Sequence, residues 1–486
     1  VSRASSASGL AASVVPGQDV PSIAVLPFVN RSRGEEDEYF SDGLADELLN
    51  VLTKIRGLRV AARASSFQFK GKNEDLASIG EKLNVATLLD GSVRKAGNRV
   101  RISVQLIKAA DRVQLWSESY DRSLDDIFAV QDDIAQSVVK ELRTTLFGDT
   151  PDSDASGRAQ ADVASASKGH GKNPEAHRLY LQGKFYIDRV NKEDTVKGIQ
   201  DLNEAVALDP KHAAAWTELA RARVNMGGYG WEPVNEGYRK ARMAVARALD
   251  AQPDYYEGYV VLSNIQRMYE WDWDGAERSA RRALELAPGD ALAMRTAGTM
   301  ALHRKRFDEA ERLFLAALGQ DPLNAGGYTA IGNLYRATER DLEAEAAYRK
   351  AIELAPLRIG VRCTLAITLA SQGRIDEALV EAGAEPAEWA RLTALAFAHH
   401  RAGRHKESKE ALRTLEERYA AESAYQIGAI HAAYGDVDKS LAWLERAREQ
   451  RDSGLPLSVF EPVFRPVHDD PRWGEFLGRI GLTRSE

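Results

Sequence analysis

Three prolines constrain the fold of this chain most strongly, because they recur at a fixed interval. Pro288, Pro322 and Pro356 are spaced 34 residues apart. When the segments are aligned on these prolines, four further positions hold matching residue types. Small residues let paired helices approach closely, large residues fill the neighbouring hole, and proline ends the second helix. The pattern predicts a solenoid of helix pairs, and the matching pairs are Gly298 and Gly332, Ala310 and Ala344, Phe314 and Tyr348, and Ala317 and Ala351.

This period and these residue types are identified as those of the tetratricopeptide repeat. Pro210 and Pro253 are expected to end two earlier repeats. In total we count about eight repeats over residues 174–458, and we expect residues 459–486 to cap the last one. Towards the C-terminus the repeats are weaker, and their interhelix turns are expected at Gly373, Gly403 and Gly435.

Two of the expected repeats are longer than the rest. The second carries about nine extra residues around 227–234, and the third carries one extra residue near 271–274. The first insertion contains Tyr229 and Trp231. Exposed aromatic side chains in an insertion are candidates for a partner contact or a homodimer contact. They equally fit packing over the neighbouring repeat, but we predict them as partner-contact residues.

Residues 21–148 alternate strand and helix signals and predict a small α/β sandwich domain. The apolar run Ile23–Phe28 suits a buried strand, and Leu44–Ile55 has helical spacing. Ser41 and Asp42 precede that helix and are candidate N-cap residues. A second strand at Leu58–Ala61, a second helix, three further strands and a closing helix follow. The predicted fold class is therefore α/β plus all-α, a small sandwich followed by a solenoid.

Two segments lack periodicity altogether. Residues 1–20 are rich in Ser, Ala and Gly, and residues 149–173 are rich in Asp, Ser, Ala and Gly. Such compositions form flexible connections. We expect the first to be a flexible leader and the second a disordered linker.

Composition and charge exclude several classes of function. The 65 Lys and Arg residues against 72 Asp and Glu residues give a net charge of −7, without the basic excess of a general nucleic-acid binder. The single cysteine, Cys363, excludes an internal disulfide framework and a Cys-based zinc site. No apolar run is long enough to span a membrane. No nucleophile–base, phosphate-loop or metal-binding motif occurs, so we predict no enzymatic activity, no metal and no cofactor.

The concave face of the solenoid is the predicted binding site, because first-helix residues of each repeat line it. Asparagine can donate to and accept from a peptide backbone, and arginine can form a forked pair with a carboxylate. We therefore predict a groove for an acidic or C-terminal peptide. The alternative is a groove that is solvated or filled by the chain itself, for instance by the linker or by residues 21–148. The predicted groove residues are Arg221, Asn225, Asn264, Arg267, Arg295, His303, Asn333 and Arg336.

Several short motifs resemble a known family. The chain is similar to the TolB-like amino-terminal module that precedes tetratricopeptide repeats in many bacterial signalling proteins. In that family the two modules usually accompany an output domain, which is a nucleotide cyclase, a winged-helix regulator or a kinase. The resemblance implies structural roles for these motifs and carries over no catalytic residue. The motifs are Ser22–Phe28, Tyr39–Leu44, Leu88–Arg94, Leu115–Asp121 and Asp125–Phe128, joined by Trp271–Asp274 and Asp470–Trp473.

These observations favour a non-catalytic segment of a bacterial signalling protein that binds a peptide or protein partner. One alternative is the regulatory region of a class III nucleotide cyclase without its catalytic domain. Another is a cell-envelope adaptor. The chain begins with Val1, and we expect a membrane helix upstream of it. That helix would tether this part in the periplasm, with the cytoplasm as the alternative.

Overall fold

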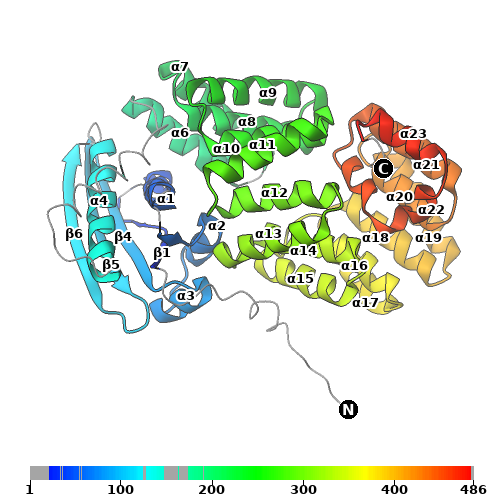
Figure 1. The fold of residues 1–486 in the computed structure, drawn as a ribbon, viewed down its shortest axis with the longest axis horizontal. Helices are drawn as coiled ribbons and strands as arrows, with labels where there is room; N and C mark the ends of the chain where they lie inside the picture. Colours follow the sequence, from blue (N-terminus) through cyan, green and yellow to red (C-terminus); the bar gives the residue numbers. More distant parts are fainter. Residues whose placement is uncertain are drawn as a thin grey trace, which may run out of the picture.

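The chain forms a small α/β module followed by a long helical solenoid (Figure 1). The expected leader at 1–20 lies outside the described residues, as does most of the expected linker at 149–173. Within that linker, Val163 is fully buried in the core and Asn173 caps the first solenoid helix. The computed structural model describes residues 21–32, 34, 37–53, 55, 57–123, 127–146, 163, 173–189 and 191–482.

The α/β module is built on one mixed sheet with the order β3-β1-β4-β5-β6. Strand β1 pairs in parallel with β3 and β4, whereas β4, β5 and β6 form an antiparallel meander. The short β2 pairs in parallel with the far end of β4. The strands are β1 (Ser22–Val25), β2 (Val29–Asn30), β3 (Arg59–Val60), β4 (Thr87–Ala96), β5 (Arg99–Lys108) and β6 (Gln114–Ser123).

Helices cover this sheet mainly on one face. On β5, Val100, Ile102, Val104 and Leu106 point to the helix-covered face and are buried, as period-two alternation requires. On β5 and β6 the opposite face is polar, and Arg99 and Arg101 there pair with Asp121. On β1 and β4 that face is apolar, and Ala24 and Leu88 form a second buried cluster there. The module's helices are α1 (Glu38–Thr53), α2 (Arg63–Ser66), α3 (Leu76–Leu83) and α4 (Ile127–Leu146), with a 3₁₀ turn at Phe67–Phe69.

The prediction that Ser41 and Asp42 cap the first helix is wrong. Helix α1 already begins at Glu38, and both side chains are buried within it. Asp42 pairs with Lys70 instead. Asp42 resembled a helix cap in the sequence because its tertiary partner lies 28 residues further along the chain.

The predicted solenoid is confirmed, and the described residues contain eight consecutive helix pairs. Each pair is one repeat, and neighbouring pairs stack on each other (Figure 1). In order, the pairs are α6 (Pro174–Ile187) with α7 (Lys192–Leu208), α8 (Ala213–Gly228) with α9 (Val234–Ala251), α10 (Tyr256–Ile265) with α11 (Trp273–Leu286), α12 (Ala291–His303) with α13 (Phe307–Gln320), α14 (Ala325–Ala337) with α15 (Asp341–Leu354), α16 (Val361–Ser371) with α17 (Ile375–Gly383), α18 (Glu388–Arg401) with α19 (His405–Tyr419), and α20 (Ala424–Ala433) with α21 (Val437–Gln450).

Packing within the repeats follows the small-against-large rule. A Cβ atom on Gly332 would lie 2.6 Å from the ring of Tyr348, and one on Gly298 would lie 2.8 Å from the ring of Phe314. Each glycine thus makes room for the aromatic side chain of the second helix in its own repeat. The two repeats therefore pack in the same way at equivalent positions, with a glycine of the first helix against an aromatic ring of the second.

The extra residue of the third repeat is absorbed by a π-helical turn. Residues Gln266–Glu270 continue α10 as a π-helix, and Trp271 follows with a left-handed φ of 57°. A π-turn accommodates one additional residue without breaking the helix. It turns Trp271 and Trp273 towards the C-terminal end of the chain, where both are buried in one apolar cluster with Phe464, Trp473 and Ile480.

The C-terminal segment does more than cap the last repeat. It consists of two 3₁₀ turns, Leu455–Val459 and Pro462–Phe464, and the short helices α22 (Arg465–His468) and α23 (Arg472–Arg479). The indole N–H of Trp273 donates to the carbonyl oxygen of Ile480 at 2.6 Å. Repeat three and the end of the chain therefore meet across more than 200 residues of sequence.

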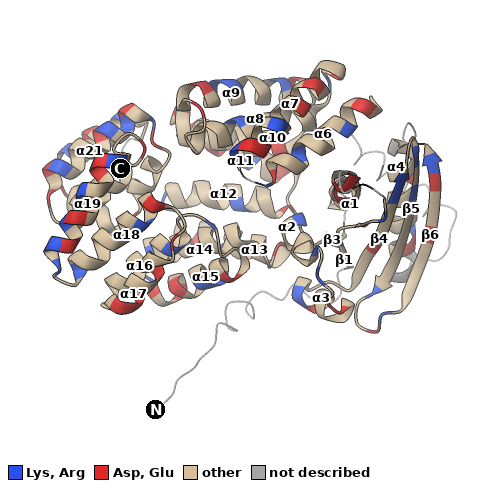
Figure 2. Cartoon of the chain, turned by 180° about the vertical axis from the view of Figure 1, so that it is seen from behind, with Lys and Arg blue, Asp and Glu red and all other residues tan. Residues whose placement is uncertain are grey.

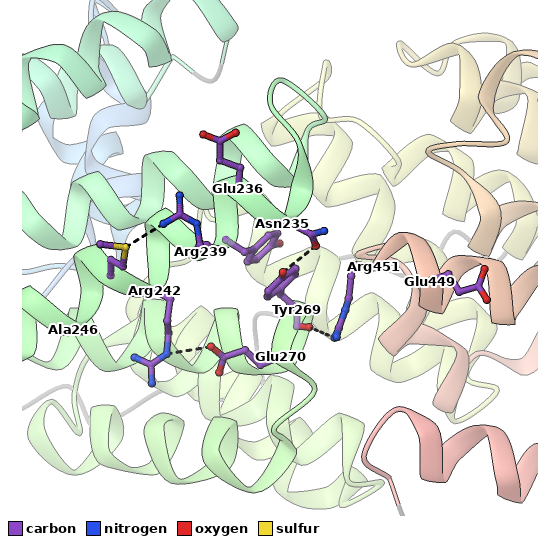
Figure 3. A pocket seen from close by; sticks show the side chains of 11 residues that line it. Asn235, Glu236, Arg239, Arg242, Ala246, Tyr269, Glu270, Glu449 and Arg451 are labelled. Carbon is purple, nitrogen blue, oxygen red and sulfur yellow. Dashed lines mark hydrogen bonds and ion pairs between the residues drawn. The ribbon is translucent and has the colours of Figure 1, made fainter.

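The last repeat also contacts the third repeat directly. Arg451, which follows α21, donates to the carbonyl oxygen of Tyr269 at 2.6 Å and covers the ring of Trp271 at 4.2 Å. Figure 3 shows this arginine reaching across a broad cleft from the last repeat to Tyr269. The ring of Tyr269 stacks on that of Tyr238. The third and eighth repeats are therefore held together at one side of the solenoid.

Candidate functional site

The main candidate site is a cavity of about 510 Å³ between the α/β module and the concave side of the solenoid. Its walls come from α1 and the β3–α2 segment of the module and from the first helices of repeats one to four. In Figure 1, α1 and α2 face the solenoid, and β6 forms the opposite edge of the module. Four of the predicted groove residues line this cavity, namely Arg221, Asn225, Asn264 and Arg295.

One side of the cavity is an ion-pair chain that fastens the module to the first two repeats. Arg63 of α2 contacts Asp46 of α1 and Asp188 of repeat one, each at 3.1 Å. Arg221 contacts the same Asp188 at 2.7 Å and Glu218 at 2.6 Å. Burial alone would raise the pKa of Asp188, but Arg63 and Arg221 lower it to about 2. Arg221 is thus a structural ion-pair partner in this state, not a free groove cation.

The module is fastened a second time at the turn between repeats four and five. The Ser65 hydroxyl donates to the Asp321 carboxylate and accepts from the backbone N–H of Leu323, the latter at 2.7 Å. The backbone N–H of Ala62 donates to the Gln320 carbonyl oxygen at 3.4 Å. Helix α2 therefore bridges the concave side, and the cavity lies between its two attachment points.

Arg295 lines this cavity, and no carboxylate among the described residues forms an ion pair with it. No ion pair or side-chain hydrogen bond joins it to any residue that the structure describes. Burial and Arg358 lower its pKa, while Asp321 and Asp290 act in the opposite direction. Next to the cavity, Arg267 donates to the Asn264 amide oxygen at 2.9 Å, and burial lowers its pKa to about 10. Two partly buried guanidinium groups thus lie on this side of the cavity, where an anion would stabilise both.

The cavity is not uniformly basic, although none of the predicted groove residues is acidic. Asp290 and Glu257 line it as well, and both carboxylates accept from the hydroxyl group of Tyr256 at 3.2 Å. Burial and the nearby Glu257 raise the pKa of Asp290 to about 6. Asp290 caps α12 through the N–H of Ala293, and such a cap cannot be told from a ligand-facing carboxylate by sequence alone. Basic and acidic residues likewise alternate over the solenoid surface (Figure 2).

The other predicted groove residues lie elsewhere. His303 and Arg336 are buried beneath the C-terminal segment, which contacts them through Phe460 and Glu461. Asn333 accepts from the Tyr348 hydroxyl at 2.8 Å. The groove is therefore divided, because the module covers part of it and the chain's own C-terminal segment covers the rest.

Cys363 and the aromatic insertion have simpler surroundings. Cys363 is buried, and burial raises the pKa of its thiol to about 12, which suits a packing role. Tyr229 is half exposed, and its ring lies 4.9 Å from that of Trp231, which packs on the core. Only Tyr229 of this pair is available to a partner in this state.

Neither a metal site nor a membrane span occurs in the ranges that the structure describes. Within those ranges, no group of three or more His, Cys, Asp or Glu side chains is placed to hold a metal ion. In the same part of the chain, no helix has the length and apolar character that a bilayer-spanning segment needs.

Three family models match parts of the chain. The model described as the second domain of HilA/YgeH-like transcriptional regulators matches residues 18–137. Two tetratricopeptide-repeat models match residues 267–325 and 325–356. The chain thus combines tetratricopeptide repeats, a class that is typically non-catalytic, with an N-terminal HilA-like domain. The TolB-like assignment of that domain stays a prediction.

A bacterial protein shares a substantial part of the sequence. The chain is 38% identical over 201 residues to the putative adenylate cyclase 3 of Rhizobium meliloti (strain 1021). The matched region covers 41% of this chain and 32% of that protein. The chain is 27% identical over 123 residues to the protein O-mannosyl-transferase TMTC3 of Mus musculus, covering 22% of this chain and 13% of that protein. The chain spans about a third or less of the length of these relatives.

Solved structures with a similar fold include tetratricopeptide-repeat proteins. A thermophilic repeat protein of Thermus thermophilus is 21% identical, with a TM-score of 0.34, and covers 40% of this chain and 98% of its own. The human IFIT1 dimer is 14% identical, with a TM-score of 0.42, and covers 67% of this chain and 87% of its own.

Proposed function

We propose that this chain is a non-catalytic interaction segment of a bacterial signalling protein that binds a peptide of its partner in the cavity between the module and repeats one to four. Tetratricopeptide repeats support a protein-interaction scaffold. The observation that carries the proposal is Arg295, a partly buried guanidinium in the cavity wall without a carboxylate partner among the described residues. A charged group in such a place is stabilised by an incoming anion.

The bound peptide would place an acidic side chain or its C-terminal carboxylate at Arg295. The amide of Asn225, which makes no side-chain hydrogen bond within the described part of the chain, faces the same cavity and would bind the peptide backbone. Asn264 would continue that contact and keep Arg267 in place. Glu257 and Asp290 lie on the same wall and would favour a basic or hydroxyl-bearing residue nearby.

A peptide-display selection tests this proposal. We expect selection on the wild-type chain to enrich Asp, Glu or a free C-terminus at one position. Selection on Arg295→Met should lose that enrichment, since Met keeps the bulk but not the charge. Arg247→Met is the matched control, because Arg247 is exposed on α9 and makes no ion pair with any residue in the described ranges. Selected sequences without an acidic position, or the same position retained by Arg295→Met, would refute the proposal.

The second candidate function is the regulatory region of a class III nucleotide cyclase. The 38% identity to a putative adenylate cyclase favours it. Its test is to assay cyclic nucleotide formation by the full-length protein with and without residues 21–482. A changed rate or a lost response would support this function, and a full-length protein without cyclase activity would exclude it.

Location is a separate expectation. If an upstream membrane helix tethers the chain in the periplasm, alkaline phosphatase fused after residue 482 should be active in living cells. An inactive fusion would favour the cytoplasm. An envelope adaptor would in addition co-purify with outer-membrane or peptidoglycan components.

A further inference from the structure

The concave side of the C-terminal repeats already holds a segment of the chain. Residues 455–468 lie along it, and two consecutive residues contact predicted groove positions. The ring of Phe460 meets that of His303 edge-on, with centroids 5.1 Å apart at 87°. The carboxylate of Glu461 pairs with Arg336. The chemistry expected of a peptide ligand, a carboxylate on a groove arginine, is thus supplied by the chain itself.

Arg336 and Glu461 depend on each other. The two residues are only 8% and 7% exposed. Burial raises the pKa of Glu461, and Arg336 opposes that rise. A buried ion pair adds little net stability over apolar packing, but removing one partner leaves a strongly unfavourable unpaired charge. This part of the groove therefore requires a carboxylate at Arg336, supplied either by the chain's own segment or by a bound peptide.

The resident segment does not fill the groove. A cavity of about 190 Å³ remains beside Glu461, Leu457 and Val463. Its other walls include the large rings of Trp389 and Phe397. An engineered apolar cavity of about 150 Å³ is large enough to bind benzene, so this space could take one more aromatic ring. A peptide with a larger residue at the place of Leu457 or Val463 would fit better than the chain's own segment.

The backbone of the segment is less regular than that of the helices around it, although Leu455, Phe464 and Val467 are fully buried. It contains two 3₁₀ turns and a single turn of helix, α22, instead of a long helix. Pro456, Pro462 and Pro466 each remove a backbone donor. Its pair between Arg465 and Glu339 is more than half exposed and contributes little. The hydrogen bonds of 3₁₀ turns have poorer geometry than those of an α-helix, so the backbone of this segment holds it in place less firmly than a helix of the same length would.

We propose that the concave side of repeats five to eight is a second peptide-binding site, and that residues 455–468 are its autoinhibitory occupant. The partner would carry Glu or Asp between bulky apolar residues, after the pattern of Phe460-Glu461-Pro462-Val463-Phe464. It would displace the resident segment and leave that segment free. The site is separate from the cavity at the module, so either proposal can fail alone.

Fluorescence anisotropy with a labelled peptide of residues 455–468 tests this. A tethered competitor acts at an effective concentration on the order of millimolar. A peptide of micromolar intrinsic affinity should therefore bind the wild-type chain roughly a thousandfold more weakly than an opened chain. Phe460→Ala with Glu461→Ala is the opened variant, since it weakens the occupant and leaves the groove intact. Arg465→Ala is the matched control, because it alters an exposed residue of the same segment and should not open it.

Binding to the opened variant should be lost when Arg336→Met is added or when the peptide carries Glu461→Gln. A peptide with Val463→Phe should bind more tightly than the native sequence. If the opened variant keeps its circular dichroism spectrum yet binds the peptide no better than the wild type, the proposal is overturned. Binding that ignores both Arg336→Met and Glu461→Gln would overturn it equally.

Hydrogen exchange on the unaltered chain gives a second, variant-free test. Amides of residues 455–468 should exchange at least about a hundredfold faster than those in the centre of α20, which the segment covers. Equal protection would show that the segment opens only when the whole solenoid unfolds. It would then be a permanent cap and not a displaceable occupant.

Discussion

A single methyl group added at Gly332 tests the packing that defines the solenoid. Its Cβ would lie 2.6 Å from Cε1 and 2.9 Å from Cδ1 of Tyr348, whereas carbon atoms pack favourably at about 3.5–4.0 Å. Tyr348 cannot easily yield, because its ring is fully buried and its hydroxyl is bonded to Asn333. Overpacking of this kind costs about 1–3 kcal/mol. The better helix propensity of Ala returns about 1 kcal/mol, so we expect Gly332→Ala to lose roughly 1 kcal/mol of stability.

Gly319→Ala is the matched control for this change. Gly319 also lies in a helix, but a Cβ there meets nothing within 4 Å. It should gain about 0.5–1 kcal/mol from helix propensity alone. Urea unfolding of both variants under one condition should therefore separate their stabilities by roughly 1.5–2 kcal/mol. If Gly332→Ala is as stable as Gly319→Ala, the close helix approach inferred from the 34-residue pattern is wrong.

Three further predictions address other parts of the molecule. Trp273→Phe removes the indole N–H that donates to the Ile480 carbonyl oxygen and leaves that buried oxygen unpaired. The chain should lose about 1–3 kcal/mol of stability. Hydrogen exchange should become faster in α23 and stay unchanged in α7, which serves as the control. In the folded chain the pKa of Asp290 is raised from 3.8 to about 6. The stability that this carboxyl confers is therefore complete below pH 3.8 and is lost as the pH rises through 6. Asp290→Asn should flatten that part of the stability profile, and a profile identical to that of the wild type would contradict this prediction. Cys363, buried with a pKa of about 12, should react with a thiol reagent at pH 8 at least about a hundredfold more slowly than free cysteine.

Residues close in sequence carried enough information to predict the repeat architecture. The proline spacing, the Gly298 and Gly332 positions and the aromatic residues 16 positions later specify one helix pair each, because all of these contacts form within a single repeat. The extra residue of the third repeat was also visible in the spacing. The sequence did not reveal that this residue produces a π-turn followed by Trp271 in a left-handed conformation. Arg451, near the other end of the chain, holds that geometry.

The groove residues show where prediction from sequence stops. Helical spacing assigned Arg221, Arg295 and Arg336 to one kind of position, and the same pattern cannot distinguish their partners. In the folded chain Arg221 is held by Asp188, Arg336 is held by Glu461, and Arg295 lacks a carboxylate partner among the described residues. Asp188 and Glu461 lie 33 and 125 residues away from their partners.

The sequence by itself determined the local units of this protein: a strand-and-helix module, a set of helix pairs and the absence of the common catalytic motifs. Periodicity reports which face of a helix is apolar, and that is sufficient to build one repeat. The tertiary structure alone decided how the ends of the solenoid are used. The module bridges the first half through Arg63 and Ser65, and the C-terminal segment occupies the second half through Glu461. Those contacts join residues far apart in sequence, where no periodic pattern records which partner a side chain will meet.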